Sequence, residues 1–260
     1  MPPQSVAFDR AVDFYDQTRG FPPGQAAFIA RLITQAGDLT PASRVLEIGV
    51  GTGRIALPVA PHVGAYYGID ISAPMMARLR AKQDGERVYL ARADATRLPF
   101  PDAAFDAIIG VHVFHLIPDW RAALNELRRA LRPGGRLLHA WTKADPAYQR
   151  VWDTWRIALG PEIEQDVGVH WRHHATFLED EGWLPTGPAL THAFIVEKAP
   201  LTLVDDLRAR LWSQTWRLTD EQIEIGAAAL RQAVQAEFAQ PENVHQFTSH
   251  FHARAFRPPA

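Results

Sequence analysis

Three glycines at alternate positions, Gly49, Gly51 and Gly53, lie between two apolar segments of the chain. The pattern predicts a buried strand that turns through the glycines into a helix. Such a turn leaves backbone N–H groups at a helix start, where a ligand can approach because glycine has no Cβ. Asp70 ends the next apolar run. An acid about 20 residues beyond such a loop is placed to accept hydrogen bonds from ribose hydroxyls, so the sequence predicts a nucleoside site.

The kind of nucleoside depends on how the glycines are read. Residues 51–56, Gly-Thr-Gly-Arg-Ile-Ala, satisfy the dinucleotide fingerprint in its Gly/Ala form. Counted from the strand, however, Glu47 precedes the glycines at the strand end. A carboxylate repels a pyrophosphate. It attracts the ammonium and sulfonium of S-adenosylmethionine, which carries no phosphate. Glu47 therefore favours the methyl donor over a nicotinamide dinucleotide.

Residues 45–53, Val-Leu-Glu-Ile-Gly-Val-Gly-Thr-Gly, resemble the start of the class I S-adenosylmethionine-dependent methyltransferases, in the small-molecule, type 11/25-like group. Residues 98–106, Leu-Pro-Phe-Pro-Asp-Ala-Ala-Phe-Asp, and Pro-Gly-Gly at 133–135 resemble the same family. The resemblance ends near residue 142. It implies an α/β fold with a Rossmann-like, seven-stranded, mostly parallel sheet, helices on both faces, and S-adenosylmethionine as the cofactor. Insertions after the fifth and sixth strands are expected to form a helical cap.

The resemblance also assigns positions around the cofactor. In the family a leading segment folds over the methionine end, and Tyr15 and Arg19 match it, with Arg19 near the carboxylate. Ile71 and Met75 match apolar positions that pack on adenine, and Asp94 matches the acid that accepts from its exocyclic amine. Simpler roles stay open: an N-terminal helix that only covers the sheet, a methionine in the core, an aspartate in a turn. The expected cofactor contacts are Tyr15, Arg19, Glu47, Gly49, Gly51, Asp70, Ile71, Met75, Asp94, Ala95 and Val111.

Two histidines, His112 and His115, follow the fourth expected strand, 107–111, where open α/β sheets place ligands. Methyl transfer from a sulfonium is an in-line displacement that needs mainly positioning. A base is needed only where the acceptor must lose a proton, and histidine is the usual one. The catalytic residue stays unknown, with His112 and His115 as candidates. The alternative is that both line the site without proton transfer. The expected substrate contacts are His112, Phe114, His115 and Trp141.

Strand–helix units predict the domain organisation. Residues 1–43 are expected to form an N-terminal helical lid and 44–142 the S-adenosylmethionine-binding core. Residues 143–189 and 198–245 are expected as helical cap insertions, and 190–197 and 246–256 as the last two strands. Helices are also expected over 8–15, 170–183 and 201–212. His250 and His252 are expected on an edge strand facing solvent. Four tryptophans, Trp152, Trp155, Trp212 and Trp216, either line an acceptor pocket or, as their helical spacing favours, pack.

Composition limits the partners. With 260 residues and a net charge of −2, the chain has no general attraction to nucleic acid or anionic membranes. It has no cysteine, which excludes disulfides, thiolate metal sites and the nucleophile of cytosine C5 methylation. His170, His173 and His174 have helical metal-ligand spacing but no paired carboxylate motif, and no metal is expected. No apolar run approaches the roughly 18 residues of a membrane span, and no signal peptide is evident, so a cytoplasmic location is expected.

The sequence therefore predicts S-adenosylmethionine-dependent methyl transfer to a small-molecule acceptor, without a nucleic-acid or membrane partner. The Asn/Asp-Pro-Pro-aromatic motif of nucleic-acid amino-methyltransferases is absent after the fourth strand. Two alternatives remain open: a nicotinamide-dependent oxidoreductase, and a cofactor-binding protein without turnover. The nature of the acceptor and the oligomeric state are not determined by the sequence.

Overall fold

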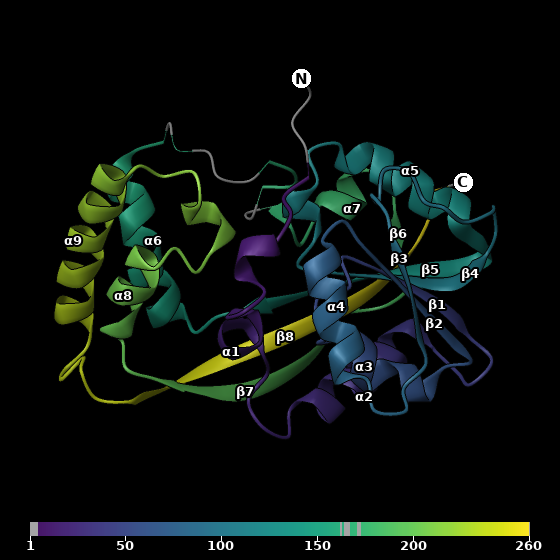
Figure 1. Cartoon of the computed structure of the whole chain (residues 1–260), viewed down its shortest axis with the longest axis horizontal. Helices are drawn as coiled ribbons and strands as arrows, with labels where there is room; N and C mark the ends of the chain where they lie inside the picture. The colour runs from purple at the N-terminus through teal and green to yellow at the C-terminus, as the bar shows by residue number, and fades with distance from the viewer. Residues whose placement is uncertain (1–4, 162, 164–166, 171–172, 260) are drawn as a thin grey trace. The chain divides into compact units, whose positions relative to one another are not determined.

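The computed structural model describes residues 5–161, 163, 167–170 and 173–259. The chain divides into two compact units. The first comprises Met1–Trp141, Asp166–His192 and Phe251–Ala260, and the second comprises Thr142–Gln165 and Ala193–His250. The elements of both units are labelled in Figure 1. Each unit has its own cluster of buried apolar side chains.

The sheet has the strand order β3-β2-β1-β4-β5-β8-β6, with β7 also pairing β8. Its first five strands are mutually parallel where they pair. The order reverses between β1 and β4, and ligands of open α/β sheets bind at the carboxyl ends of the strands at such a switch point. The strands are β1 (Arg44–Ile48), β2 (Ala65–Asp70), β3 (Val88–Arg92), β4 (Phe105–Val111), β5 (Leu131–Lys143), β6 (Leu184–Pro185), β7 (Leu190–Lys198) and β8 (His245–Arg257).

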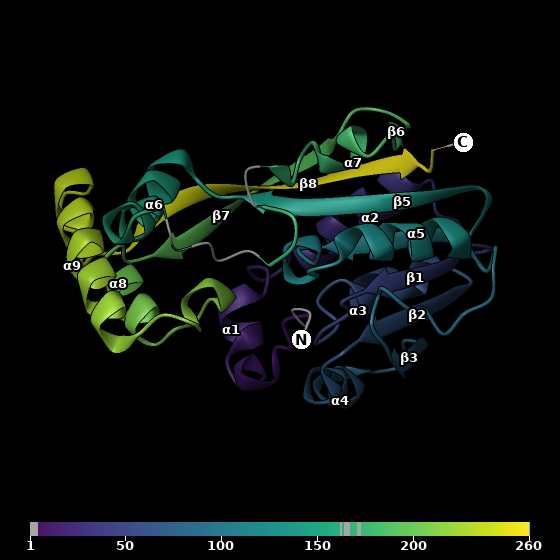
Figure 2. The same cartoon turned by 90° about the horizontal axis from the view of Figure 1, so that it is seen from above.

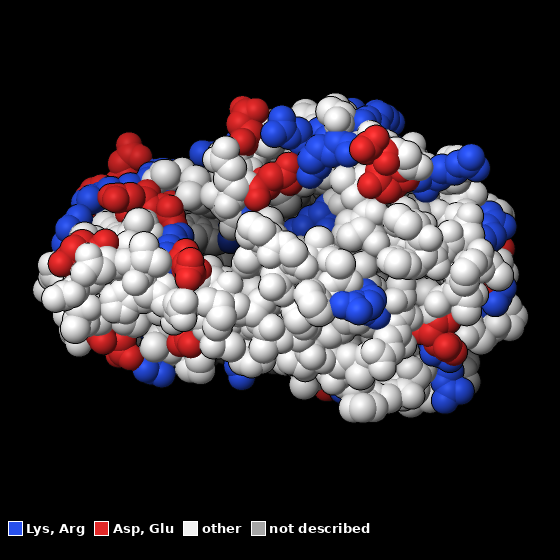
Figure 3. Space-filling view, turned by 90° about the horizontal axis from the view of Figure 1, so that it is seen from below, with Lys and Arg blue, Asp and Glu red and all other residues white. Residues whose placement is uncertain are grey.

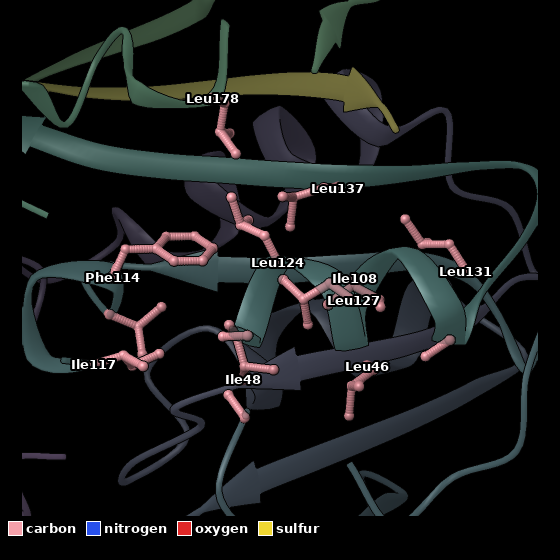
Figure 4. Close-up of a cluster of buried hydrophobic side chains, with 14 of the residues drawn as sticks. Leu46, Ile48, Ile108, Phe114, Ile117, Leu124, Leu127, Leu131, Leu137 and Leu178 are labelled. Atoms are coloured by element: carbon pink, nitrogen blue, oxygen red, sulfur yellow. The ribbon is translucent and has the colours of Figure 1, made fainter. Parts of the chain in front are cut away.

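Helices cover both faces of this sheet, as expected for the predicted α/β class (Figure 2). On one face Leu124 and Leu127 of α5 pack with Leu46 and Ile108 of the strands (Figure 4). On the other face Gly37 abuts the side chain of Leu138. The α-helices of the first unit are α1 (Tyr15–Arg19), α2 (Ala26–Gly37), α3 (Ala56–Val59), α4 (Ala73–Lys82), α5 (Trp120–Ala130) and α7 (Phe177–Asp180).

Local capping explains where two of these helices begin. The Ser72 hydroxyl accepts a hydrogen bond of 3.3 Å from Met75 N, and Pro74 occupies the first turn of α4, where its missing N–H costs least. The Asp119 carboxylate accepts from Ala122 N at 3.0 Å and begins α5. Each cap satisfies a backbone N–H that has no partner within the helix.

Other boundaries differ from the sequence expectations. The expected helix over 8–15 is wrong: a 3-10 turn, η1 (Asp9–Ala11), comes first and α1 begins only at Tyr15. The helix expected over 170–183 is also wrong in the described part, where only α7 is helical; residues 171 and 172 lie outside the described residues. The carbonyl of His174 bonds to His139 Nε2 at 2.8 Å, so it does not serve a helix. The helix expected over 201–212 is shorter, because Arg210 adopts a φ of +51°.

The second unit is built from α6 (Pro146–Leu159), α8 (Thr202–Arg208), the 3-10 turn η5 (Ser213–Thr215) and α9 (Asp220–Glu237). Trp155 is fully buried in its apolar cluster, and the Trp152 and Trp212 ring centroids lie 4.0 Å apart. These three tryptophans therefore pack within this unit. A capping box of Thr219 and Gln222 begins α9. Within the described residues, no helix has both the length and the apolar character needed to cross a bilayer.

Candidate functional site

The glycine loop joins β1 to α3 at the switch point of the sheet. Gly49 and Gly51 have φ values of +68° and +53°, the left-handed region that favours glycine. A Cβ on Gly49 would lie 2.7 Å from Val113 Cγ2, so the loop after β1 abuts the loop after β4. A Cβ on Gly51 would meet Met75 Cε at 3.5 Å, an ordinary contact. Gly49 is thus required by packing as well as by conformation, and Gly51 by conformation.

The amides of this loop are used within the protein. Val50 N donates to Ile69 O at 3.0 Å, and Gly53 N donates to Val50 O at 3.0 Å. Gly51 N donates to the Asp70 carboxylate, at 2.8 Å from Oδ2. The Asp70 carboxylate therefore fixes the conformation of the loop.

Asp70 bridges the glycine loop and α4 from the end of β2. Its Oδ1 atom accepts from Ser72 N at 2.8 Å, while Oδ2 holds Gly51 N. Burial raises the pKa of Asp70, and the amide hydrogen bonds from Ser72, Gly51 and Ile71 oppose that rise. Each carboxylate oxygen can accept more than one hydrogen bond. The side chain can therefore hold the loop and still accept from ribose hydroxyls.

Glu47 is buried, which is unusual for a carboxylic acid side chain. Its side chain is 3% exposed, and its Oε2 accepts a hydrogen bond of 2.8 Å from the hydroxyl of the fully buried Tyr66. Burial raises the pKa of Glu47 to about 8, although Tyr66 and the nearby Arg54 lower it. The carboxyl group is therefore mostly protonated at neutral pH. Sequence reasoning treated Glu47 as a charged carboxylate and missed Tyr66, whose approach depends on strand pairing.

The third expected acid, Asp94, follows β3 and organises its own turn. Its Oδ1 accepts from Thr96 N at 2.9 Å and from Thr96 Oγ1 at 2.8 Å. Its Oδ2 lies 3.4 Å from Ser5 Oγ of the N-terminal segment. The turn role that was left open for Asp94 is therefore present.

The N-terminal segment bonds to the glycine loop and to α4. The Asp16 carboxylate accepts from Thr52 Oγ1 at 2.6 Å and from Lys82 Nζ at 2.9 Å. Arg54 Nη1 donates to the carbonyl oxygen of Arg19 at 2.7 Å. These bonds bring Tyr15 and Arg19, which belong to the same short helix, to the glycine loop.

A second bond ties the start of this segment to α4. Asp9 Oδ1 accepts from Ser72 Oγ at 2.6 Å, next to Asp70. Sequence reasoning missed the structural roles of Asp9, Asp16, Thr52 and Arg54. The hydroxyl between the glycines and the acid beside Tyr15 were visible signals, but only the fold brings them together.

The histidines after β4 lie among other basic groups. His112 has a φ of +50°, an uncommon value for a residue with a side chain, and its N–H donates to Ala140 O at 3.3 Å. Burial, followed by the charges of Arg54, His115, His139 and Arg19, holds its pKa well below the usual range. The His112 imidazole is therefore neutral near pH 7 and able to accept a proton. The carbonyl of His115 accepts from Gly168 N at 3.1 Å.

An aromatic and histidine cluster adjoins these residues on β5. The His139 ring stacks on Trp141 with centroids 5.1 Å apart, and Trp141 stacks on His252 of β8 at 5.3 Å. Burial lowers the pKa of His139 to about 4. Phe114 is 2% exposed and packs edge-on against His139, which leaves little of its surface for a substrate. Sequence reasoning missed His139, because alternation along one strand does not reveal the partners of a buried residue.

The structure also tests the expected edge position of His252 and locates the apolar cofactor candidates. His252 does not lie on an edge strand, because β8 is flanked by β5 on one side and by β6 and β7 on the other; Thr191 Oγ1 lies 2.9 Å from its Nδ1. The apolar cofactor candidates are at least partly buried near the carboxyl ends of β2, β3 and β4, namely Ile71, Met75, Ala95 and Val111. In the described part of the chain, no group of three or more His, Cys, Asp or Glu side chains has an arrangement suited to a metal ion.

Comparisons with known proteins add the family. Residues 46–139 match the family described as a methyltransferase domain. Demethylmenaquinone methyltransferase of Thermus thermophilus is 44% identical over 103 residues, which are 36% of this chain and 45% of that protein. The curated relatives that the chain matches are spanned by it over 38–59% of their length.

Solved structures share the fold at low identity. A candidate type II methyltransferase of Anaeromyxobacter dehalogenans has a TM-score of 0.61 at 21% identity, covering 89% of this chain and 97% of that one. Phosphoethanolamine N-methyltransferase 2 of Haemonchus contortus, solved with S-adenosyl-L-methionine, has a TM-score of 0.53 at 18% identity, covering 97% of this chain and 57% of that one. Residues 46–139 thus match the methyltransferase domain family, in agreement with the resemblance to the class I S-adenosylmethionine-dependent enzymes, and the solved structures confirm the Rossmann-like fold.

Proposed function

We propose that the protein is an S-adenosylmethionine-dependent methyltransferase that acts on a small-molecule acceptor. The observation that carries this proposal is the match of residues 46–139 to the methyltransferase domain family, because this range contains the glycine loop, Asp70 and Asp94. Asp70 holds the loop through a hydrogen bond of 2.8 Å from Gly51 N. The nicotinamide-dependent alternative is therefore disfavoured.

The residues present fit the parts of this donor. Asp70 accepts from the ribose hydroxyls, and Ile71, Met75 and Ala95 supply apolar surface for the adenine. Asp94 accepts from the adenine amine. Glu47, Gly49, Gly51, Tyr15, Arg19 and Val111 surround the methionine portion. The bonds of the N-terminal segment to Thr52, Ser72 and Lys82 support its proposed role as a lid.

The protein's part in the reaction is to position the donor and the acceptor and to exclude water. The donor supplies an electrophilic methyl group on a sulfonium, and in-line displacement by a well-held nucleophile requires little further catalysis. His112, His115 and Trp141 are proposed to surround the acceptor, with the buried Phe114 as a support for them and not as a contact surface. His112 is the candidate base where the acceptor must lose a proton, and its lowered pKa makes the imidazole a weak one.

The acceptor is proposed to be a small molecule rather than a nucleic acid. The Thermus thermophilus relative is named for a quinone-type acceptor, demethylmenaquinone, and this activity belongs to that protein. On the face drawn in Figure 3, Lys and Arg side chains are interspersed with Asp and Glu. Such a surface offers no continuous basic field to a phosphate backbone. The helices α6, α8 and α9 lie outside the matched domain.

Calorimetry with S-adenosylmethionine, S-adenosylhomocysteine and NAD tests the donor. We expect binding of the first two and none of NAD; the reverse would refute the proposal. Transfer of a radiolabelled methyl group to a panel of hydroxyl, amine and carbon acceptors tests turnover. Donor binding without transfer to any member of a broad panel would favour the remaining alternative, a cofactor-binding protein without turnover.

A further inference from the structure

Tyr66 is a buried polar residue for which the site described above has no role. It lies in the interior of β2, and its ring is fully buried. In the parallel register of β1 and β2, Tyr66 is opposite Val45 and Gly68 is opposite Glu47. Residues paired in this way, and those two positions apart, share one face of the sheet. Tyr66 and Glu47 therefore project on the same side, and their oxygen atoms meet at 2.8 Å.

The surroundings of Glu47 leave its carboxyl group without an ionic partner. The groups that act on it are Tyr66 from β2, Arg54 from beyond the glycine loop, and Asp70 from the end of β2. The charge of Arg54 lowers the pKa of Glu47. However, Arg54 Nη1 donates its hydrogen bond to the carbonyl oxygen of Arg19. Among the ion pairs of the described residues, none includes Glu47. A buried carboxyl in this state keeps its proton, because charging it without a partner is costly.

The Glu47–Tyr66 pair lies next to the loop at which the donor is proposed to bind. Glu47 lies two residues before Gly49, on the strand that leads into the loop proposed to receive the amino-acid portion of the donor. An ammonium group arriving there would supply the missing partner. We propose, on the premise of the function above, that Tyr66 positions Glu47 and that the pair releases one proton to solvent when the donor's ammonium group binds.

The consequence is a linkage between pH and donor affinity. Before binding, the proton remains on the Glu47 carboxyl group. After binding, the carboxylate faces the ammonium, Tyr66 still donates its hydrogen bond, and the proton has left to the buffer. The complex thus holds fewer protons than the free protein, so affinity rises with pH, by at most about tenfold per unit, until the free carboxyl group is itself ionised.

Calorimetry on the full chain tests this without knowledge of the acceptor. S-adenosylhomocysteine, which carries the ammonium, is compared with 5′-methylthioadenosine, which lacks the amino-acid portion. Each is titrated at pH 6, 7 and 8 in two buffers of different ionisation enthalpy, which gives the number of protons released. The variants are Glu47→Gln and Tyr66→Phe. Tyr67→Phe is the matched control, because Tyr67 lies on the opposite face, against Phe100 and Phe105.

The parent protein and Tyr67→Phe are expected to release about one proton per S-adenosylhomocysteine at pH 6–7, with affinity rising about five- to tenfold per pH unit. Glu47→Gln should release none and show flat affinity. Tyr66→Phe should shift the rise to higher pH, because the tyrosine hydrogen bond lowers the pKa of Glu47. With 5′-methylthioadenosine, no protein should release a proton.

The possible outcomes distinguish a wrong role for the Glu47–Tyr66 pair from a wrong proposed function. Binding of S-adenosylhomocysteine by the parent protein with no proton release would overturn the role of the pair and leave the proposed function standing. Failure of the parent protein to bind S-adenosylmethionine or its product would overturn the proposed function, and this inference with it. Should Tyr66→Phe not fold, the Glu47→Gln and 5′-methylthioadenosine measurements still decide.

Discussion

Thr52 Oγ1 donates a hydrogen bond of 2.6 Å to Asp16 Oδ1, which joins the glycine loop to the N-terminal helix α1. Lys82 at the end of α4 donates to the same carboxylate at 2.9 Å. Burial alone would raise the pKa of Asp16, but the hydrogen bonds from Thr52 and Lys82 and the charges of Lys82 and Arg78 outweigh it and lower the pKa. Asp16 therefore remains ionised near neutral pH and connects three separate segments of the site.

Replacing Asp16 with Asn is expected to loosen the N-terminal segment. The amide cannot match the charge-assisted bonds to Thr52 and Lys82, so affinity for S-adenosylhomocysteine should fall about three- to tenfold. Amide hydrogen exchange should accelerate in α1. Asp13→Asn, an exposed change in the preceding segment, is the control and should leave both measurements unaltered. Equal affinity of Asp16→Asn and the parent protein would contradict the role of this segment in donor binding.

Gly49→Ala tests the packing between the loops after β1 and β4. An alanine would combine a positive φ with a Cβ 2.7 Å from Val113 Cγ2. Together these should cost about 2–4 kcal/mol of unfolding free energy, measured by denaturant titration. Gly85→Ala is the matched control, because Gly85 has a φ of +91° with no atom near the added Cβ, and should cost only about 1–2 kcal/mol. If the two variants were equally stable, the contact with Val113 would be unimportant.

The parts of the fold that sequence reasoning predicted correctly depend on local information. The strands β1 and β2 are mostly apolar, and α4 begins after Ser72, with a proline in its first turn. The glycine loop and Asp70 were found from spacing alone, because the strand–loop–helix unit fixes how far apart they lie. Their roles toward a ligand remain proposals.

The parts that were missed depend on partners distant in the sequence. Glu47 is protonated because it is buried, and the hydrogen bond from Tyr66, which acts against this, reaches it only through the register of β1 and β2. His174, which was expected in a helix, lies before α7, and its carbonyl bonds to His139 on β5. His252 was predicted on an edge strand, because the alternating pattern of one strand does not indicate the order of strands in the sheet. In each case the deciding contact joins elements whose pairing a linear pattern does not contain.

Asp70→Ala is expected to weaken donor binding by about 1–3 kcal/mol, by leaving ribose hydroxyls unpaired. It should also release the amides of Gly51 and Ser72, whose hydrogen exchange should accelerate. Asp70→Asn retains one acceptor oxygen, so its donor affinity in calorimetry should lie between those of the parent protein and Asp70→Ala. Asp84→Asn, an exposed change, controls for the loss of a charge. Unaltered donor affinity in Asp70→Ala would remove Asp70 from the proposed site.

Glu47 should make stability decrease toward alkaline pH. Its pKa is about 8 in the folded protein and near the ordinary 4.5 when unfolded, so its contribution is complete below pH 4.5 and is lost as pH rises through 8. The loss is at most about 1.4 kcal/mol per pH unit within this window. Glu47→Gln should therefore gain melting temperature relative to the parent protein between pH 5 and 8. Parallel curves would refute the raised pKa; exposed Glu242→Gln is the control and should follow the parent.

His139 should act on the acid side. Its pKa is lowered to about 4 from 6.5, chiefly by burial, so the neutral imidazole favours the folded state. That contribution is complete above pH 6.5 and is lost as pH falls through 4, because the unfolded chain takes up the proton first. His139→Gln keeps a donor for the His174 carbonyl but cannot titrate, so its melting temperature should fall less steeply between pH 6.5 and 4. Exposed His62→Gln is the control for removing an imidazole. An NMR titration in which the His139 ring resonances shift near pH 6.5 would show that the ring is ionised in the folded protein and would contradict the neutral, stacked arrangement with Trp141.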